Sequence, residues 1–234
     1  MDISFEYKGV TTLKMKRITI FSGHYGSGKT NLAVNYAVMQ RKMGYEVSIA
    51  DLDIVNPYFR TKDSEELFSD SGIELISLPF ANTSVDLPSL PSSAYGLFDR
   101  KDRQVIIDLG GDDRGALALG RFIPRLLEEN NYDFIFTVNF YRPLTRNVDE
   151  ALQVFNEIEY ASRIKFTKIV NNSNLGSQTT VDDIMKTVKM TEELSEKTGV
   201  EYAFTSVCED LAEEISCRLG KENVFSLKLQ KKLF

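Results

Sequence analysis

The sequence predicts an α/β fold in three layers (α/β/α), with helices on both faces of a mostly parallel central sheet. The first observation is that short apolar runs alternate along the chain with longer amphipathic segments. The second is that these short runs are almost wholly apolar, as in parallel strands that are buried on both faces. The third is that polar residues cluster directly after the runs, at the edge where open parallel sheets bind ligands.

The apolar runs identify the expected strands, and the segments between them identify the helices. In chain order the expected strands are 18–21, 47–50, 73–78, 105–107, 134–138, 167–170 and 201–205. The expected helices are 31–43, 114–128, 145–160, 180–198 and 209–219. Thr180 and Asp183 resemble a capping box with a shorter acid, while Gly199 and Gly220 are typical helix stops.

Two segments leave alternatives open. Residues 82–96 hold Pro88, Pro91 and several serines with weak periodicity, which favours a surface loop over an insertion that contacts a partner. The tail 222–234 is apolar and basic. It either packs on its own domain, with Phe225, Leu227 and Leu229 alternating as in a strand, or forms an amphipathic helix at a membrane surface. We expect the first, and therefore expect no membrane contact through the tail.

Length and composition limit the domain count and the class of protein. The chain has 234 residues, of which 42% are hydrophobic and 26% charged, which suits a single domain spanning residues 1–234 with an N-terminal extension at 1–15. A formal net charge of -6 argues against a general nucleic-acid-binding surface. Cys208 and Cys217 imply no disulfide framework, and no signal peptide or long apolar span is evident, so we expect a cytoplasmic protein.

A glycine-rich loop follows the first expected strand and precedes the first expected helix. It fits G-x-x-x-x-G-K-T, the phosphate-binding loop or Walker A motif, with the residues Gly23, His24, Tyr25, Gly26, Ser27, Gly28, Lys29 and Thr30. Backbone N–H groups and the helix N-terminus would face the phosphates. Lys29 would reach the β- and γ-phosphates, and the Thr30 hydroxyl would bind Mg²⁺. The loop therefore predicts a nucleotide-binding protein.

Acidic and amide side chains stand at the ends of later strands. Asp51-Leu52-Asp53 ends the second strand, Asp108-Leu109-Gly110-Gly111 forms a Walker-B-like D-x-x-G, and Asn171 ends a later strand. Together with the loop, these motifs resemble the MinD/ParA-like P-loop ATPases (SIMIBI class; CobQ/CobB/MinD/ParA nucleotide-binding domain) over about residues 17 to 210. The resemblance implies the P-loop NTPase fold.

The resemblance also implies roles for single residues. Asp53 matches the switch aspartate that places the attacking water, and with Lys29 it would be catalytic. The residues implied as metal ligands are Thr30, Asp51, Asp53 and Asp108. Asn171 matches the asparagine that reads the base, and Ser206 and Val207 match the loop over the adenine.

The Walker A motif departs from the family pattern in one respect. His24 stands where the family carries its signature lysine, which reaches across a dimer to the partner's phosphates. Histidine carries a full charge only when protonated, so His24 either contacts phosphate or packs beside the loop. An ATP-dependent homodimer is the corresponding expectation.

Four arginines are further candidates for the predicted site. Arg114, Arg121, Arg142 and Arg146 lie near strand ends or helix starts, where an arginine can neutralise phosphate. The alternative for each is an ordinary solvated side chain.

The expected function is that of a Mg-ATP-binding switch protein with weak ATPase (hydrolase) activity, coupled to a protein partner. ATP is expected rather than GTP because Asn171-Asn172-Ser173-Asn174 lacks the lysine and aspartate of N-K-x-D. The rivals are a small-molecule ATP-dependent kinase or ligase related to dethiobiotin synthetase, and a nucleotide-binding scaffold that does not hydrolyse.

Overall fold

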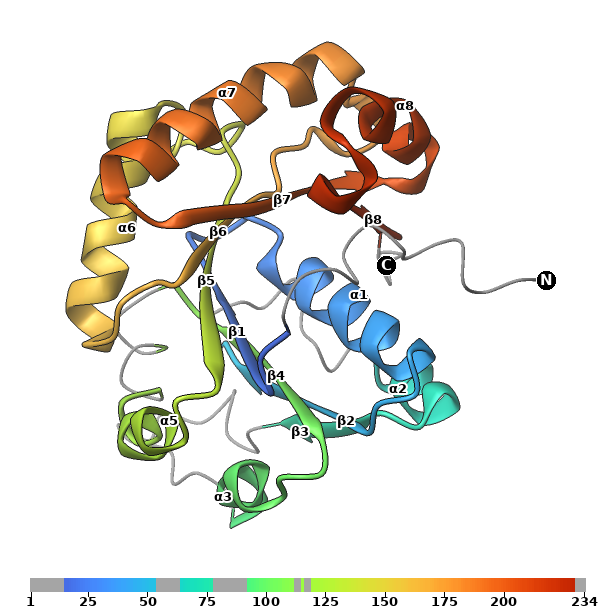
Figure 1. Ribbon diagram of the computed structural model, residues 1–234, viewed down its shortest axis with the longest axis vertical. Coiled ribbons are helices and arrows are strands. Elements are labelled where there is room, and N and C mark those ends of the chain that lie inside the picture. Colours follow the sequence, from blue (N-terminus) through green and yellow to red (C-terminus); the bar gives the residue numbers. More distant parts are fainter. Residues whose placement is uncertain (1–14, 54–63, 78–91, 112–114, 116–118, 230–234) are drawn as a thin grey trace.

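A computed structural model describes residues 15–53, 64–77, 92–111, 115 and 119–229 (Figure 1). Within them lies one sheet of eight parallel strands in the order β3-β2-β4-β1-β5-β6-β7-β8, which confirms the predicted α/β class. The strands are β1 (Ile18–Ser22), β2 (Val47–Leu52), β3 (Glu74–Ser77), β4 (Gln104–Leu109), β5 (Tyr132–Val138), β6 (Lys168–Asn171), β7 (Glu201–Cys208) and β8 (Val224–Leu227).

Helices cover both faces of the sheet. They are α1 (Lys29–Lys42), α2 (Glu65–Ser71), α3 (Ser92–Asp99), α5 (Ile123–Glu129), α6 (Val148–Ser162), α7 (Val181–Thr198) and α8 (Glu209–Leu219), with the 3₁₀ turns η4 (Gly176–Gln178) and η5 (Lys221–Asn223). In Figure 1, α1 and α2 lie on one face, while α3, α5 and α6 lie on the other. Each face has its own buried apolar cluster, and a third cluster joins α7 to α8. Within the described residues, no helix combines the length and apolar character needed to cross a membrane.

Two expected segments differ from the structure. The helix expected at 114–128 is interrupted: residues 115 and 119–120 are helical, a turn follows at 121–122, and α5 then begins at Ile123. Pro124 lies in the first turn of α5, where the missing N–H of proline costs no helical hydrogen bond. Residues 112–114 and 116–118 of that segment lie outside the described part. The loop expected at 82–96 is wrong over 92–96, which belong to α3, while 82–91 are not described.

The helix ends predicted for α7 are confirmed. The Thr180 hydroxyl accepts a hydrogen bond from the Asp183 N–H, and the Asp183 carboxylate accepts one from the Thr180 N–H, which completes the capping box. Gly199 ends the helix at a φ of 70°.

The C-terminal tail adds an edge strand to the sheet. β8 pairs with β7, and Phe225 is fully buried between Tyr36 of α1 and Phe204 of β7, with ring centroids 6.1 and 5.5 Å away. The described part of the tail thus packs on its own domain. Residues 230–234 lie outside the description.

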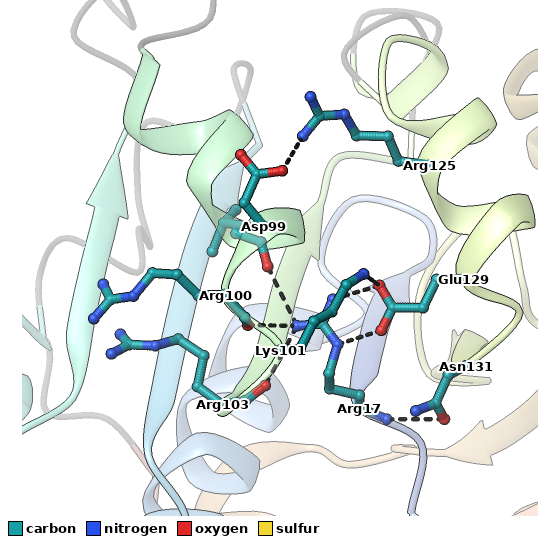
Figure 2. Close-up of polar contacts among 9 residues, drawn as sticks. Arg17, Asp99, Arg100, Lys101, Arg103, Arg125, Glu129 and Asn131 are labelled. Carbon is teal, nitrogen blue, oxygen red and sulfur yellow. Dashed lines mark hydrogen bonds and ion pairs between the residues drawn. The ribbon is translucent and has the colours of Figure 1, made fainter.

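Arg17, directly before β1, connects several segments at the amino ends of the strands, away from the phosphate loop (Figure 2). Its guanidinium donates to both carboxylate oxygens of Glu129, and its Nη1 donates to the backbone carbonyls of Leu97, Arg100 and Arg103. Burial by itself raises the pKa of Glu129, but hydrogen bonds and charge from Arg17 and Lys101 outweigh burial, so the pKa is lowered. This Arg17 cluster joins β1, α3 and α5 at the amino ends of the strands, opposite the carboxyl ends that carry the phosphate loop.

Candidate nucleotide-binding site

The phosphate loop occupies the position that the sequence predicts, between β1 and α1. Gly28 is the N-cap of α1 with a φ of 83°, and Lys29 and Thr30 begin the helix. A Cβ at Gly28 would lie 2.3 Å from Asn172 Nδ2, and a Cβ at Gly111 would lie 2.2 Å from the carbonyl oxygen of Gly23. Neither position has room for a side chain, because the loop is held closely by the ends of β4 and β6.

The Lys29 ammonium meets the acidic ends of two strands behind the loop. Its Nζ lies 2.5 Å from Asp53 Oδ2, and both side chains are nearly buried. The Asp53 N–H donates to Asp51 Oδ1 at 3.1 Å. Asp51 of β2 stands opposite Asp108 of β4 in the parallel register, and Asp108 is fully buried. Motifs from three separate segments therefore converge on one charged cluster.

Burial and the neighbouring charges shift the pKa values in this cluster. Burial alone lowers the pKa of Lys29, but the charges of Asp108, Asp53 and Asp51 outweigh it and leave that pKa raised. Burial and the charge of Asp108 raise the pKa of Asp51 to about 7. The cluster thus holds a lysine that stays protonated and an aspartate that resists ionisation.

The residues at this site fit a Mg²⁺ ion whose remaining ligands are water and phosphate oxygens. Thr30, Asp51, Asp53 and Asp108 bring only oxygen ligands, the type this ion prefers, and all four are buried or nearly so. In the described part of the chain, no three acidic, histidine or cysteine side chains converge closely enough to hold a metal ion by themselves. Mg²⁺ does not require this, because it usually binds through one or two carboxylates, water and the substrate phosphates.

The side chains predicted to surround the base face in two directions. Asn171 is fully buried, donates to Thr187 Oγ1 of α7 at 3.1 Å and accepts from the Ser173 N–H at 3.0 Å. Its neighbour Asn172 faces the phosphate loop instead, where Nδ2 donates to the Ser27 carbonyl oxygen at 2.6 Å and Oδ1 accepts from Ser206 Oγ. Asn172, Ser206 and Val207 help to line a small pocket at this edge.

The sequence predicts Asn171 as a site residue but does not predict Asn172, although the adjacent pair of asparagines is a signal for both. Consecutive residues at a strand end face opposite sides, so of the pair Asn171 and Asn172 only one side chain can face the loop. A strand boundary known to within one residue does not tell which of the two it is.

The outer side of the loop is exposed. Tyr25 is 53% exposed, and His24 Nδ1 lies 3.0 Å from the Tyr25 carbonyl oxygen. Arg142, in the turn after β5, donates from Nε to the Gly26 carbonyl oxygen at 2.8 Å. Arg114 lies outside the described residues, whereas Arg146 is exposed and pairs with Glu150.

Comparison with known proteins supports the resemblance. No protein-family model matches the sequence. The chain is 29% identical over 159 residues to the iron-sulfur cluster carrier protein of Pyrococcus abyssi, an alignment covering 64% of this chain and 50% of that protein. The chain therefore spans about half the length of this relative.

Solved structures resemble the fold at low sequence identity. FtsY from Mycoplasma mycoides is 16% identical with a TM-score of 0.56, over 86% of this chain and 67% of that one. Chloroplast FtsY from Physcomitrella patens is 16% identical with a TM-score of 0.58, over 88% and 60%. The signal recognition particle 54 kDa protein from Aeropyrum pernix, solved with GDP, is 14% identical with a TM-score of 0.51, over 84% and 42%.

The predicted resemblance is thus confirmed at the level of the fold. The phosphate loop between β1 and α1, the parallel sheet and these similarities together show that the chain has the fold of the P-loop NTPases of the SIMIBI class.

Proposed function

We propose that the chain is a Mg-ATP-binding switch protein of the MinD/ParA type, with weak ATPase activity that couples nucleotide state to a protein partner. The observation that carries the proposal is the ion pair between Lys29 of the phosphate loop and Asp53 at the end of β2. A phosphate at the loop competes with Asp53 for the same ammonium. Binding of the nucleotide therefore separates Asp53, at the end of β2, from its partner Lys29. Such an exchange of partners can shift a protein from one conformational state to another.

The same exchange prepares the chemistry. Once Lys29 turns to the β- and γ-phosphates, the Asp53 carboxylate becomes available to orient the attacking water. Thr30 and Asp108 would hold Mg²⁺, with Asp51 beside them, and the ion would neutralise charge on the phosphates. Phosphoryl transfer depends mainly on positioning and charge neutralisation, which this cluster supplies.

ATP is proposed rather than GTP because the segment after β6 lacks the N-K-x-D pattern. The Aeropyrum pernix protein was solved with GDP, but it is only 14% identical to this chain, so its nucleotide does not decide the base bound here. We assign Asn171 an indirect role at the base. Its carboxamide accepts a hydrogen bond from the Ser173 N–H and donates one to Thr187 Oγ1, which fixes the segment behind the base. Asn172 and Ser206, which face the loop, complete that wall of the site.

We do not propose that this chain carries an iron-sulfur cluster, which is the role in the name of the Pyrococcus abyssi relative. Iron-sulfur clusters are held mainly by cysteine thiolates. The sequence has two cysteines, Cys208 at the end of β7 and Cys217 on α8, and neither has a second cysteine within a closely spaced pair.

Thermal unfolding tests the binding site. Because a ligand that binds only the native state stabilises it, Mg-ATP is expected to raise Tm, and Lys29→Ala is expected to lose most of that ligand-induced shift. Lys42→Ala, an exposed lysine at the far end of the same helix, is the matched control and keeps the shift. Equal shifts for the wild type and Lys29→Ala would refute the assignment, and a larger shift with Mg-GTP would refute the choice of base.

Turnover separates the switch from its two rivals. A switch protein releases phosphate slowly, and its partner accelerates the release. A kinase or ligase requires a small-molecule co-substrate, and a scaffold releases none. Steady-state phosphate release, measured alone, with candidate small molecules and with lipid vesicles, distinguishes the three.

A further inference from the structure

Arg142 differs from most arginines in the described part of the chain. Arg17, Arg41, Arg100, Arg103, Arg125, Arg146 and Arg218 each lie within ion-pair distance of a carboxylate. Arg142 has no carboxylate partner among the described residues. Its side chain bonds instead to the phosphate loop, through Nε and the Gly26 carbonyl oxygen at 2.8 Å.

A rigid turn presents Arg142 to the loop. Asn139, just past β5, accepts from the Arg142 N–H through its carbonyl oxygen at 3.2 Å, and from Thr145 Oγ1 at 2.6 Å. Its side-chain Oδ1 accepts from the Tyr141 N–H at 3.0 Å. β5 pairs directly with β1, which leads into the loop, so this turn and the loop emerge side by side from the sheet.

The loop needs a further cation. Asp51, Asp53 and Asp108 surround Lys29, and a bound triphosphate adds more negative charge than one Mg²⁺ neutralises. Residue 24 contributes a histidine where the resemblance leads one to expect a lysine. A guanidinium is always charged and can hold a phosphate with two nitrogens at once.

We propose that Arg142 binds the terminal phosphate of the nucleotide and supplies the permanent positive charge that a histidine at position 24 lacks. Nε stays anchored on the Gly26 carbonyl oxygen, and the two terminal nitrogens of the same planar group bond to the phosphate oxygens. Gly26 takes part in this arrangement. Its φ is +79°, a conformation that strains residues with a Cβ, and a Cβ there would lie 3.5 Å from Arg142 Cδ, in van der Waals contact with the side chain that crosses it. The inference rests on the proposed function, since it requires a triphosphate at the loop.

Binding of two nucleotides tests the assignment. Calorimetry with Mg²⁺ compares a non-hydrolysable ATP analogue with ADP for the wild type, Arg142→Ala and Arg142→Lys. The control is Arg146→Ala, an exposed arginine of the same segment that pairs with Glu150. Loss of charged hydrogen bonds is expected to weaken analogue binding by Arg142→Ala about tenfold or more. ADP affinity stays within about twofold, because ADP lacks the terminal phosphate. Arg142→Lys recovers part of the loss, and the control binds both nucleotides like the wild type.

The ADP measurement separates phosphate binding from a role in shaping the loop. If Arg142→Ala weakens ADP and the analogue equally, the side chain only supports the loop and the inference is wrong. Unchanged affinity for the analogue also overturns it, while the proposed function stands because the wild type binds. A wild type that binds neither nucleotide overturns both.

Discussion

At the scale of single residues, the pairing of Lys29 with Asp53 answers a physical problem. A nearly buried ammonium needs an opposite charge within bonding distance, since desolvation of an unpaired ion is costly. In the absence of phosphate, Asp53 provides that charge. The pair therefore preserves the loop lysine in charged form until a nucleotide arrives.

Asp53→Asn is expected to separate binding from hydrolysis. The variant no longer competes for Lys29 with a full charge, so Mg-ATP binds at least as tightly as to the wild type, but the water loses its orienting carboxylate. Calorimetry and phosphate release measure the two effects. Asp149→Asn, an exposed aspartate on α6, serves as the control. Hydrolysis by Asp53→Asn at the wild-type rate would show that Asp53 does not place the water.

Asp51 gives the stability of the ligand-free protein a predictable pH dependence. Its pKa rises from 3.8 to about 7 on folding, so the native state binds more protons than the unfolded state between those values. The contribution of Asp51 to the free energy of unfolding is therefore fully present below about pH 4 and is lost as the pH rises to about 7.

Asp51→Asn is expected to remove this dependence. Asparagine is neutral, and its side-chain oxygen can still accept the Asp53 N–H. The Tm of the variant relative to the wild type is expected to increase from pH 5 to pH 8, measured with a chelator and without nucleotide. A constant difference in Tm across that range would mean that Asp51 ionises as readily in the folded protein as in the unfolded chain.

Much of the residue-scale site follows from the sequence. The loop spacing predicts the places of Lys29 and Thr30, and the strand ends predict those of Asp51, Asp53 and Asp108. The contacts of Asn172 with Ser27 and of Arg142 with Gly26 were beyond prediction. Each joins segments more than a hundred positions apart through one specific side-chain atom. Periodicity indicates which strands exist, but not which side chains meet across their ends.

At the scale of elements, prediction succeeded where the apolar pattern was long and had clear ends. α7 is the best example, because a capping box and a glycine mark its two ends. The segment 92–99 was harder to predict, since Ser92, Ser93 and Gly96 weaken the helical pattern of α3. β8 was ambiguous because its four residues suit either a strand or a short helix. Pairing with β7, a tertiary interaction, decides the matter.

The packing of β8 can be tested with one substitution. Phe225→Ala is expected to lower the free energy of unfolding by about 3–5 kcal/mol, because a fully buried ring between Tyr36 and Phe204 is removed. Leu229→Ala, at a position 47% exposed, is expected to change it by no more than about 0.5 kcal/mol. Urea unfolding measures both. Similar small effects for the two variants would mean that the tail contributes little to the fold.

At the scale of the whole molecule, the exposed outer side of the loop bears on assembly. His24 and the half-exposed Tyr25 lie on this side, and in the ATP-dependent dimer expected from the sequence a second copy would approach there. We expect a dimer with a non-hydrolysable ATP analogue and a monomer without it, as measured by light scattering. His24→Lys, which restores a permanent charge, is expected to raise the dimer fraction. A monomer under every condition, for both proteins, would exclude the ATP-dependent dimer.

The sheet order has a consequence for how the chain is completed during synthesis. β1 leaves the ribosome well before its neighbours β4 and β5, which come later in the chain. Glu129, which pairs with Arg17, is also made later than its partner. The same holds for Arg142 and Asn172, which bond to the phosphate loop. A nascent chain that already carries the whole Walker A motif therefore still lacks its supports, and we infer that nucleotide capture begins only once β6 has emerged.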